Sequence, residues 1–142
     1  GVRTDRYRAE WAGLGTDPAD IPLTGVGRHV VVAETEKEAL EVAKRGYVKW
    51  RESFLVLWKK HNMMPVAHAI FPERFEDAEA QGRAVAGTPD KVRDFLQKTV
   101  DDAGLNYLLC RFAFGDITGK EALASPDLFV RQVMPVLESA RT

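Results

Sequence analysis

Two side chains in this 142-residue sequence stand where they could take part in chemistry. His29 begins an apolar, β-branched run, and a histidine that titrates near neutral pH can steer protons or anions. The alternative is a strand-end histidine hydrogen-bonded to the backbone. Arg111 closes a later apolar run, where it would meet an anionic substrate or pair with Asp116. We take His29 and Arg111 as candidate site residues.

A candidate anion site begins at Gly87 and Thr88, because the free amides at a helix N-terminus can hold an anion. Plain capping is the favoured alternative, since Thr88 is a good N-cap and Pro89 suits the first helical position. His61 and His68 have no acidic or cysteine partners at metal-ligand spacing, so we expect no metal site. No Ser/His/Asp triad or nucleotide-binding glycine loop is present.

These residues are positioned by a strand, helix and strand unit from Arg83 to Gly115. The run 84–86 predicts a strand buried on both faces that ends at Gly87. An amphipathic helix is expected over 89–103, with Gly104 as its left-handed stop. The run 105–114 is apolar on both faces, which favours a parallel strand and hence a crossover unit.

A second unit precedes the first one. Residues 26–34 predict a strand, and Thr35 with Glu38 forms a capping box that opens a long helix over about 36–60. Further helices are expected at 5–14, at 75–82, as a turn at 120–124, and as a last helix capped by Ser125 and bent or ended by Pro135. Three strands alternating with helices predict an α/β fold.

Composition points to a single domain over residues 1–142. The formal net charge of -1, with both signs interspersed, gives no footprint for nucleic acid or an anionic membrane. No apolar run approaches the roughly 20 residues that span a bilayer. The one cysteine, Cys110, excludes an internal disulfide and fits a reducing compartment, and the N-terminus is not a signal sequence. We therefore expect a cytoplasmic location.

Four stretches resemble the C-terminal part of the bacterial-luciferase-like, flavin-dependent monooxygenases. They occur in the family's order and spacing. They are RHVVVAETEKEA at 28–39, VAGTPDKV at 85–92, DDAGLNYLLCRFAFGD at 101–116 and LFVRQVMPVL at 128–137. The Gly-Thr-Pro turn followed by the LF-x-x-x-VMP-x-L helix is the most specific part of this resemblance.

The resemblance implies a TIM-barrel-like (β/α)8 fold, of which this chain would supply the last three β/α units. It also implies reduced FMN, or a deazaflavin, which reacts with O2 through a flavin hydroperoxide to oxidise a small organic substrate. The earlier strands of the family provide most of the flavin contacts. We therefore expect no cofactor to bind this chain alone, and its status as an enzyme is open.

The resemblance also assigns roles to residues. It places His29 near the flavin and substrate, and it places Phe112 or Phe114 as an apolar wall at the end of the last strand. It places Met63 and Met64 in a loop that covers the substrate pocket. The substrate or flavin pocket would then contain Arg111, Phe112, Phe114, Met63 and Met64. The alternatives are ordinary packing of the aromatic residues and of the loop.

Two kinds of partner follow from the incomplete sheet. Three parallel strands leave two open edges and an inner face without a partner, so we expect either the missing N-terminal barrel part or self-association, most simply as a C2 dimer. The function would be an inactive portion of a monooxygenase. The alternatives are a non-catalytic oligomeric binding module of the same fold, and an unrelated small β/α ligand-binding protein.

Overall fold

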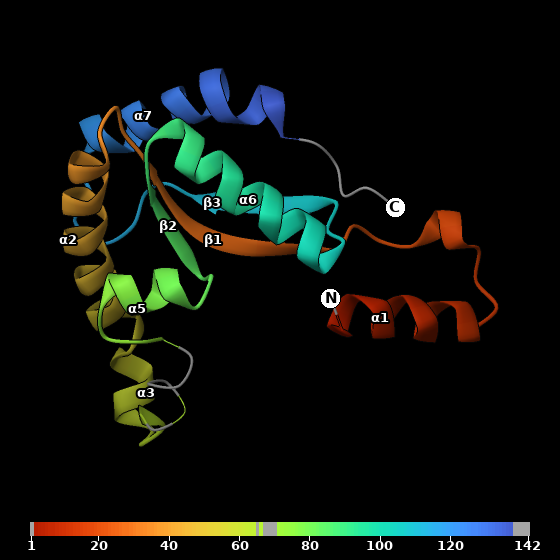
Figure 1. The fold of residues 1–142 in the computed structure, drawn as a ribbon. Helices are drawn as coiled ribbons and strands as arrows, with labels where there is room; N and C mark the ends of the chain where they lie inside the picture. The colour runs from red at the N-terminus through yellow and green to blue at the C-terminus, as the bar shows by residue number, and fades with distance from the viewer. Residues whose placement is uncertain (1, 65, 67–70, 138–142) are drawn as a thin grey trace.

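Three parallel strands form the centre of the structure, a computed structural model that describes residues 2–64, 66 and 71–137. They are β1 (Gly25–Val32), β2 (Ala84–Gly87) and β3 (Tyr107–Arg111), arranged in the order β2–β1–β3 (Figure 1). His29 is opposite Ala84 on one side and Arg111 on the other. The central strand is therefore the first in sequence, and His29 lies where all three strands meet.

Helices cover both faces of this sheet. On one face lie α2 (Glu36–Phe54) and α5 (Phe75–Ala80), which pack on Val31, Ala84 and Ala86. On the other face lie α6 (Pro89–Ala103), α7 (Gly119–Leu128) and the π-helical turn Phe129–Val133, which pack on Val30, Val32 and Val85. Because successive strand residues point to opposite faces, one run of valines serves both cores.

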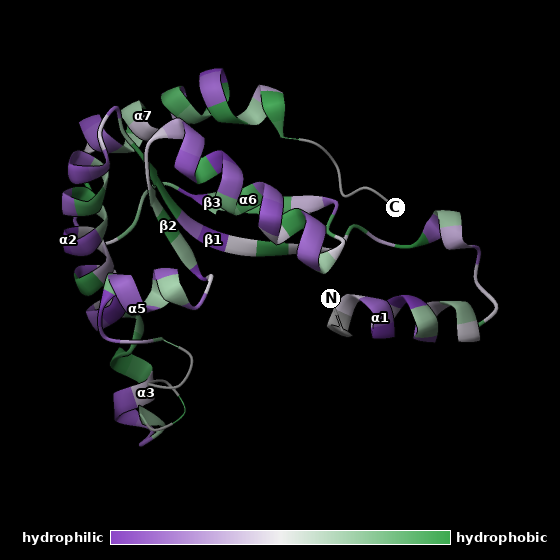
Figure 2. Cartoon of the chain, viewed as in Figure 1, coloured by the Kyte–Doolittle hydropathy of each residue, from purple (hydrophilic) through white to green (hydrophobic). Residues whose placement is uncertain are grey.

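The remaining helices lie at the margins of the sheet. The helix α3 (Val56–Lys60) extends beyond α2, and α1 (Val2–Gly13) lies near the end of α6, where Arg8 donates to the Gly104 carbonyl at 2.6 Å (Figure 1). Hydrophilic and hydrophobic residues alternate along α2 and α6 (Figure 2), as expected for helices with one side on a core. Among the helices that the structure describes, none is both long and apolar enough to cross a membrane.

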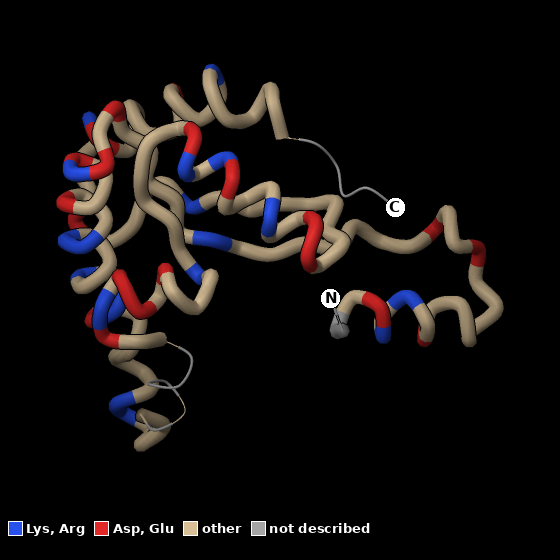
Figure 3. Tube along the Cα trace, in the orientation of Figure 1, with Lys and Arg blue, Asp and Glu red and all other residues tan. Residues whose placement is uncertain are grey.

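Charged residues of both signs lie close together along α2, α5 and α6 (Figure 3). Lys91 of α6 bonds Glu36 at 2.7 Å and Glu79 at 3.2 Å, and Lys44 of α2 bonds Glu76 at 2.7 Å. The side chains of these pairs are partly exposed, and surface ion pairs typically contribute about 0–1 kcal/mol each. The mixture agrees with the sequence-based expectation of interspersed charge.

Most of the predicted elements are confirmed. The predicted strand 26–34 is β1, the helix 89–103 is α6 with Gly104 left-handed at φ 60°, and the sheet is parallel. The prediction of one long helix over about 36–60 is wrong in one respect, because the helix is interrupted at the buried Leu55 between α2 and α3. Pro135 lies in the short 3-10 turn Met134–Val136, so the expected end of the last helix at this proline is confirmed.

The last strand differs from the prediction. β3 covers five residues instead of ten, and it is an edge strand whose Tyr107 and Leu109 are 49% and 50% exposed. It runs parallel to β2 but pairs only with β1. An apolar run on both faces predicts burial on both faces, yet one face of β3 has no helix over it.

The prediction that Ser125 caps a separate last helix is wrong. Helix α7 already begins at Gly119, with Thr118 and Glu121 forming a complete capping box, and Ser125 lies inside it. The buried Ser125 hydroxyl instead accepts the Val32 N–H at 2.8 Å. β3 ends opposite His29, so Val32 has no acceptor on that side of β1 and the serine supplies one.

We expect Ser125→Ala to lower the free energy of unfolding by about 1–3 kcal/mol, because it leaves the buried Val32 amide without a partner. Thr88→Ala is the matched control. Thr88 occupies the N-cap of α6 but makes no side-chain capping bond, so its loss should cost about 0.5 kcal/mol or less. Urea unfolding of the two variants measures both. Equal losses of unfolding free energy in the two variants would show that the Ser125–Val32 hydrogen bond does not stabilise the fold more than an unbonded threonine side chain does.

Candidate functional site

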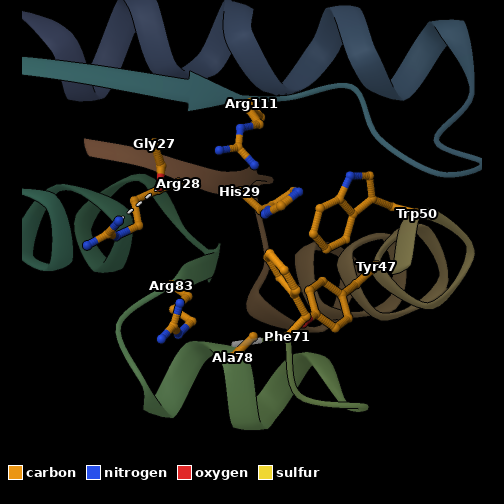
Figure 4. A pocket seen from close by; sticks show the side chains of 9 residues that line it. All are labelled: Gly27, Arg28, His29, Tyr47, Trp50, Phe71, Ala78, Arg83 and Arg111. Atoms are coloured by element: carbon orange, nitrogen blue, oxygen red, sulfur yellow. Dashed lines mark hydrogen bonds between the residues drawn. The ribbon is translucent and has the colours of Figure 1, made fainter. Parts of the chain in front are cut away.

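A cavity of about 130 Å³ opens beside the middle of β1, between α2, α5 and the end of β3 (Figure 4). Its walls combine cationic and aromatic side chains around one histidine. The lining residues are Gly27, Arg28, His29, Tyr47, Trp50, Phe71, Ala78, Arg83 and Arg111. Elements from widely separated parts of the sequence therefore build it.

His29 stands at the inner end of the cavity and is only 5% exposed. Its ring meets Trp50 at 4.3 Å and Phe114 at 4.7 Å between centroids, both edge-on. Its Nε2 atom is buried and has no hydrogen-bond partner among the residues that the structure describes. Burial, together with the nearby charge of Arg111, lowers the pKa of His29 to about 4. The imidazole is therefore neutral at neutral pH and can exchange a hydrogen bond with a ligand.

The pleat of β1 and its register with β3 place Arg111 over the cavity. Gly27 and His29 face the same side of the strand, and Arg111 is the register partner of His29. A Cβ at Gly27 would lie 2.6 Å from the Nη2 atom of Arg111, so the guanidinium occupies the space that a side chain there would fill. Gly27 thus allows the arginine to lie close to the strand.

Two more arginines line the cavity from the β2 side. Arg28 donates from Nη1 to the Gly27 carbonyl at 2.9 Å, while its Nε atom is buried and has no partner within the described part of the chain. Arg83 donates from Nε to the Gln81 side chain at 3.0 Å. Burial, and then the charges of Arg83 and Arg111, lower the pKa of Arg28. Three guanidinium groups therefore act on the same space.

Aromatic residues of α2 and of the segment before α5 form the opposite wall. Trp50 stacks on Phe54 with centroids 5.1 Å apart, and Phe71 meets Trp50 edge-on at 5.8 Å. The Tyr47 hydroxyl donates to the Pro72 carbonyl at 2.9 Å, and Arg51 donates from Nε to the Phe71 carbonyl at 2.9 Å. These bonds hold the wall in place.

The structure brings together only part of the predicted site. His29 and Arg111 line the same cavity, and Phe114 packs against His29. Phe112 faces the other core instead, where it meets Phe129 at 5.2 Å, because neighbouring residues of an extended segment alternate in direction. The predicted pairing of Arg111 with Asp116 is wrong, since Asp116 pairs with Arg45 at 3.2 Å.

The other predicted residues lie elsewhere. Met63 and Met64 follow α3 and are not among the residues that line the cavity. Gly87 and Thr88 lie at the end of β2, where Lys91 is already paired with two carboxylates. His68 lies outside the described residues. Among the described residues, no cluster of His, Cys, Asp and Glu could hold a metal ion.

Sequence reasoning missed Arg28, Arg83, Trp50 and Phe71. As the neighbour of His29 in a strand, Arg28 would normally point to the opposite face. It reaches the cavity because β2 begins only at Ala84, opposite His29, which leaves Arg28 beyond the sheet edge and beside Arg83. The available signal was Arg83, a basic residue immediately before the short strand β2. Local sequence does not reveal the strand register, which decides whether Arg83 lies beside Arg28.

The chain is similar to a curated protein and to a solved structure, while no protein-family model matches it. The uncharacterized protein y4wF of Sinorhizobium fredii is 34% identical over 115 residues, which are 80% of this chain and 33% of that protein. The crystal structure of monooxygenase RslO1 from Streptomyces bottropensis matches with a TM-score of 0.63 at 19% identity, over 93% of this chain and 36% of that enzyme. The chain thus spans about a third of the length of either relative. It shares its fold with that third of a monooxygenase.

Proposed function

We propose that this chain is the C-terminal portion of a luciferase-like, flavin-dependent monooxygenase, which uses reduced FMN or a deazaflavin and O2 to oxidise a small organic substrate. The observation that carries the proposal is the fold shared with RslO1 across nearly the whole of this chain and only 36% of that enzyme. The four sequence stretches that resemble the luciferase-like family are independent support.

The all-parallel sheet supports a partial (β/α)8 barrel, with a limit set by the strand order. In a closed ring each strand neighbours the next in sequence, whereas here β1 lies between β2 and β3. The chain therefore does not supply three consecutive strands of a ring. Only β1 and β2 are both consecutive in the sequence and adjacent in the sheet. The exposed residues Tyr107 and Leu109 on β3 would face the missing part of the barrel.

A flavin does not fit the cavity around His29. Pockets for drug-sized ligands enclose about 300–1,000 Å³, whereas this cavity measures about 130 Å³. A tricyclic ring system would need further walls from residues outside this chain. We therefore assign His29, Trp50 and Phe114 to the edge of a larger site and derive no chemical step through the flavin.

Flavin titration tests the proposal. We expect no FMN binding at micromolar concentration by the chain alone, and micromolar binding after co-expression with the part of y4wF that the chain does not match. Quenching of flavin fluorescence measures both, and light scattering gives the mass of each sample. FMN binding by the chain alone would refute the view that its site is incomplete.

The same samples decide against the main alternative. β3 is an edge strand with exposed apolar side chains, and such edges promote pairing with a second copy of the chain. This feature also favours a non-catalytic oligomeric module. A stable dimer of the chain that neither joins the co-expressed part nor binds flavin would favour that module and overturn the enzyme proposal. A mixed complex that binds FMN would support the enzyme.

A further inference from the structure

We propose that Arg28, Arg83 and Arg111 form a binding site for the oxyanion head group of a small aromatic acid, whose ring lies against Trp50 and Phe71. All of these residues belong to this chain and line one cavity (Figure 4). That such an acid would be the substrate rests on the proposed function. The binding of the anion does not, and it can be measured separately.

The first reason is positive charge that the protein itself does not balance. Within the described residues, none of the three arginines has a carboxylate within ion-pair distance. Elsewhere in the chain this is unusual, because Arg45 bonds Glu121 at 2.6 Å and Arg93 bonds Asp94 at 2.8 Å. The carboxylate of Glu79 on α5 already accepts from Lys91 at 3.2 Å and from the Ala86 amide at 3.2 Å.

Arg28 is also repelled by Arg83 and Arg111, although burial is the larger cause of its lowered pKa. The charges of Arg83 and Arg111 both lower the pKa of Arg28, and Arg111 also lowers that of His29. Placing like charges around a partly buried space is unfavourable unless a counter-charge enters it. An anion in the cavity would remove this cost from all three arginines at once.

Two residues that line the cavity also carry unused hydrogen-bonding atoms. The Arg28 Nε and the His29 Nε2 are both buried and have no partner among the described residues. Most buried polar groups in proteins are bonded, so two orphans on adjacent residues call for an explanation. An oxyanion would accept from Arg28 Nε. The nearly fully buried His29 would donate from Nε2 in the tautomer that carries its proton there.

The shape and residue types narrow the ligand class. A cavity of about 130 Å³ is below the usual range for nucleotide-sized or drug-sized ligands, so it suits a head group with a small body. Guanidinium groups bind planar or tetrahedral oxyanions through paired hydrogen bonds, which a lysine cannot reproduce. Trp50 and Phe71 supply an apolar wall for an aromatic body.

Calorimetric titration of the purified chain tests the inference with four probes: phenyl phosphate, benzoate, inorganic phosphate and benzyl alcohol. We expect binding of phenyl phosphate or benzoate that weakens with added salt, weaker binding of inorganic phosphate, and none of benzyl alcohol. Phenyl phosphate against benzoate distinguishes a tetrahedral from a planar head group. Benzyl alcohol binding as tightly as the acids would overturn the anion assignment, and inorganic phosphate binding as tightly would overturn the aromatic wall.

Arg111→Gln should weaken the binding of the better acid by about 10- to 100-fold, because one charge-assisted contact is lost. Arg111 is exposed, so this change should leave the fold intact, which circular dichroism checks. Arg93→Gln on α6 is the matched control and should not change the affinity. No binding by the unaltered chain, or equal losses in the two variants, would refute the proposal, whatever the flavin titration gives.

Discussion

Gly115→Ala is expected to lower the free energy of unfolding by about 2–5 kcal/mol. Gly115 has φ +64°, a left-handed conformation that costs an alanine about 1–2 kcal/mol. A Cβ there would also overlap the carbonyl oxygen of Gly46 on α2, and overpacking against backbone adds about 1–3 kcal/mol. The loop after β3 and helix α2 cross at this point, so neither backbone can move without the other.

Gly82→Ala separates the two causes. Gly82 has a similar φ of +68°, but a Cβ there would have no atom within 4 Å, so only the conformational cost of about 1–2 kcal/mol should appear. Urea unfolding at neutral pH measures both variants. If the two lose the same stability, the contact between Gly46 and Gly115 is not tight in solution.

The crossing also matters for the cavity. Phe114 immediately precedes Gly115 and packs on His29, while Trp50 lies one helical turn beyond Gly46 on α2. Gly46 itself leaves room for the neighbouring loop, since a Cβ there would meet Ile117 at 2.8 Å and the Phe114 carbonyl at 3.1 Å. Two glycines thus set the distance at which the aromatic residues enclose the histidine.

Acidification from pH 6.5 to pH 4 should destabilise the fold by about 3 kcal/mol through His29 alone. The unfolded chain binds a proton near pH 6.5, but burial and Arg111 lower the pKa of the folded His29 to about 4. The stability that this residue gives is therefore complete above pH 6.5 and is lost as the pH falls towards 4. Urea unfolding at several pH values measures the slope.

His29→Phe provides the control for this prediction. It keeps an aromatic ring between Trp50 and Phe114 but has no proton to bind, so its stability should stay level between pH 6.5 and 4.5. Glu76 and Glu121, whose pKa values are held near 2 by Lys44 and Arg45, lose their ion pairs only at lower pH. An unchanged slope in the variant would show that another group is responsible.

Local signals predicted the parts of the fold that depend on neighbouring residues. Thr35 accepts the Glu38 amide at 3.3 Å at the start of α2, and Pro89 and Gly104 mark the two ends of α6 as expected. Ser125 is the exception, because Thr118 caps the helix that Ser125 was predicted to begin. Both Thr118 and Ser125 are residue types that favour an N-cap. The Ser125 hydroxyl instead accepts a hydrogen bond from the buried Val32 amide.

The strand order and most of the cavity could not be predicted in this way. Strand pairing joins segments that are far apart, and nothing in the four residues of β2 states that β1 will separate it from β3. The meeting of Arg28 with Arg83 follows from that register. His29 and Arg111 were found because single residue types carried the signal, whereas the aromatic wall depends on how α2 crosses the sheet.

The central position of β1 has a consequence during synthesis. β1 is made first, yet it pairs with strands made much later, and the Thr24 amide beside it bonds Asn106 across 82 residues of sequence. At the usual 5–20 residues per second, the ribosome needs roughly 4–16 s to make that distance. The three valines that end β1 pair with β2 alone, so they have no strand partner until residues 85–87 have been made. A nascent chain of this kind would depend on ribosome-associated chaperones more than one whose strands pair in the order in which they emerge.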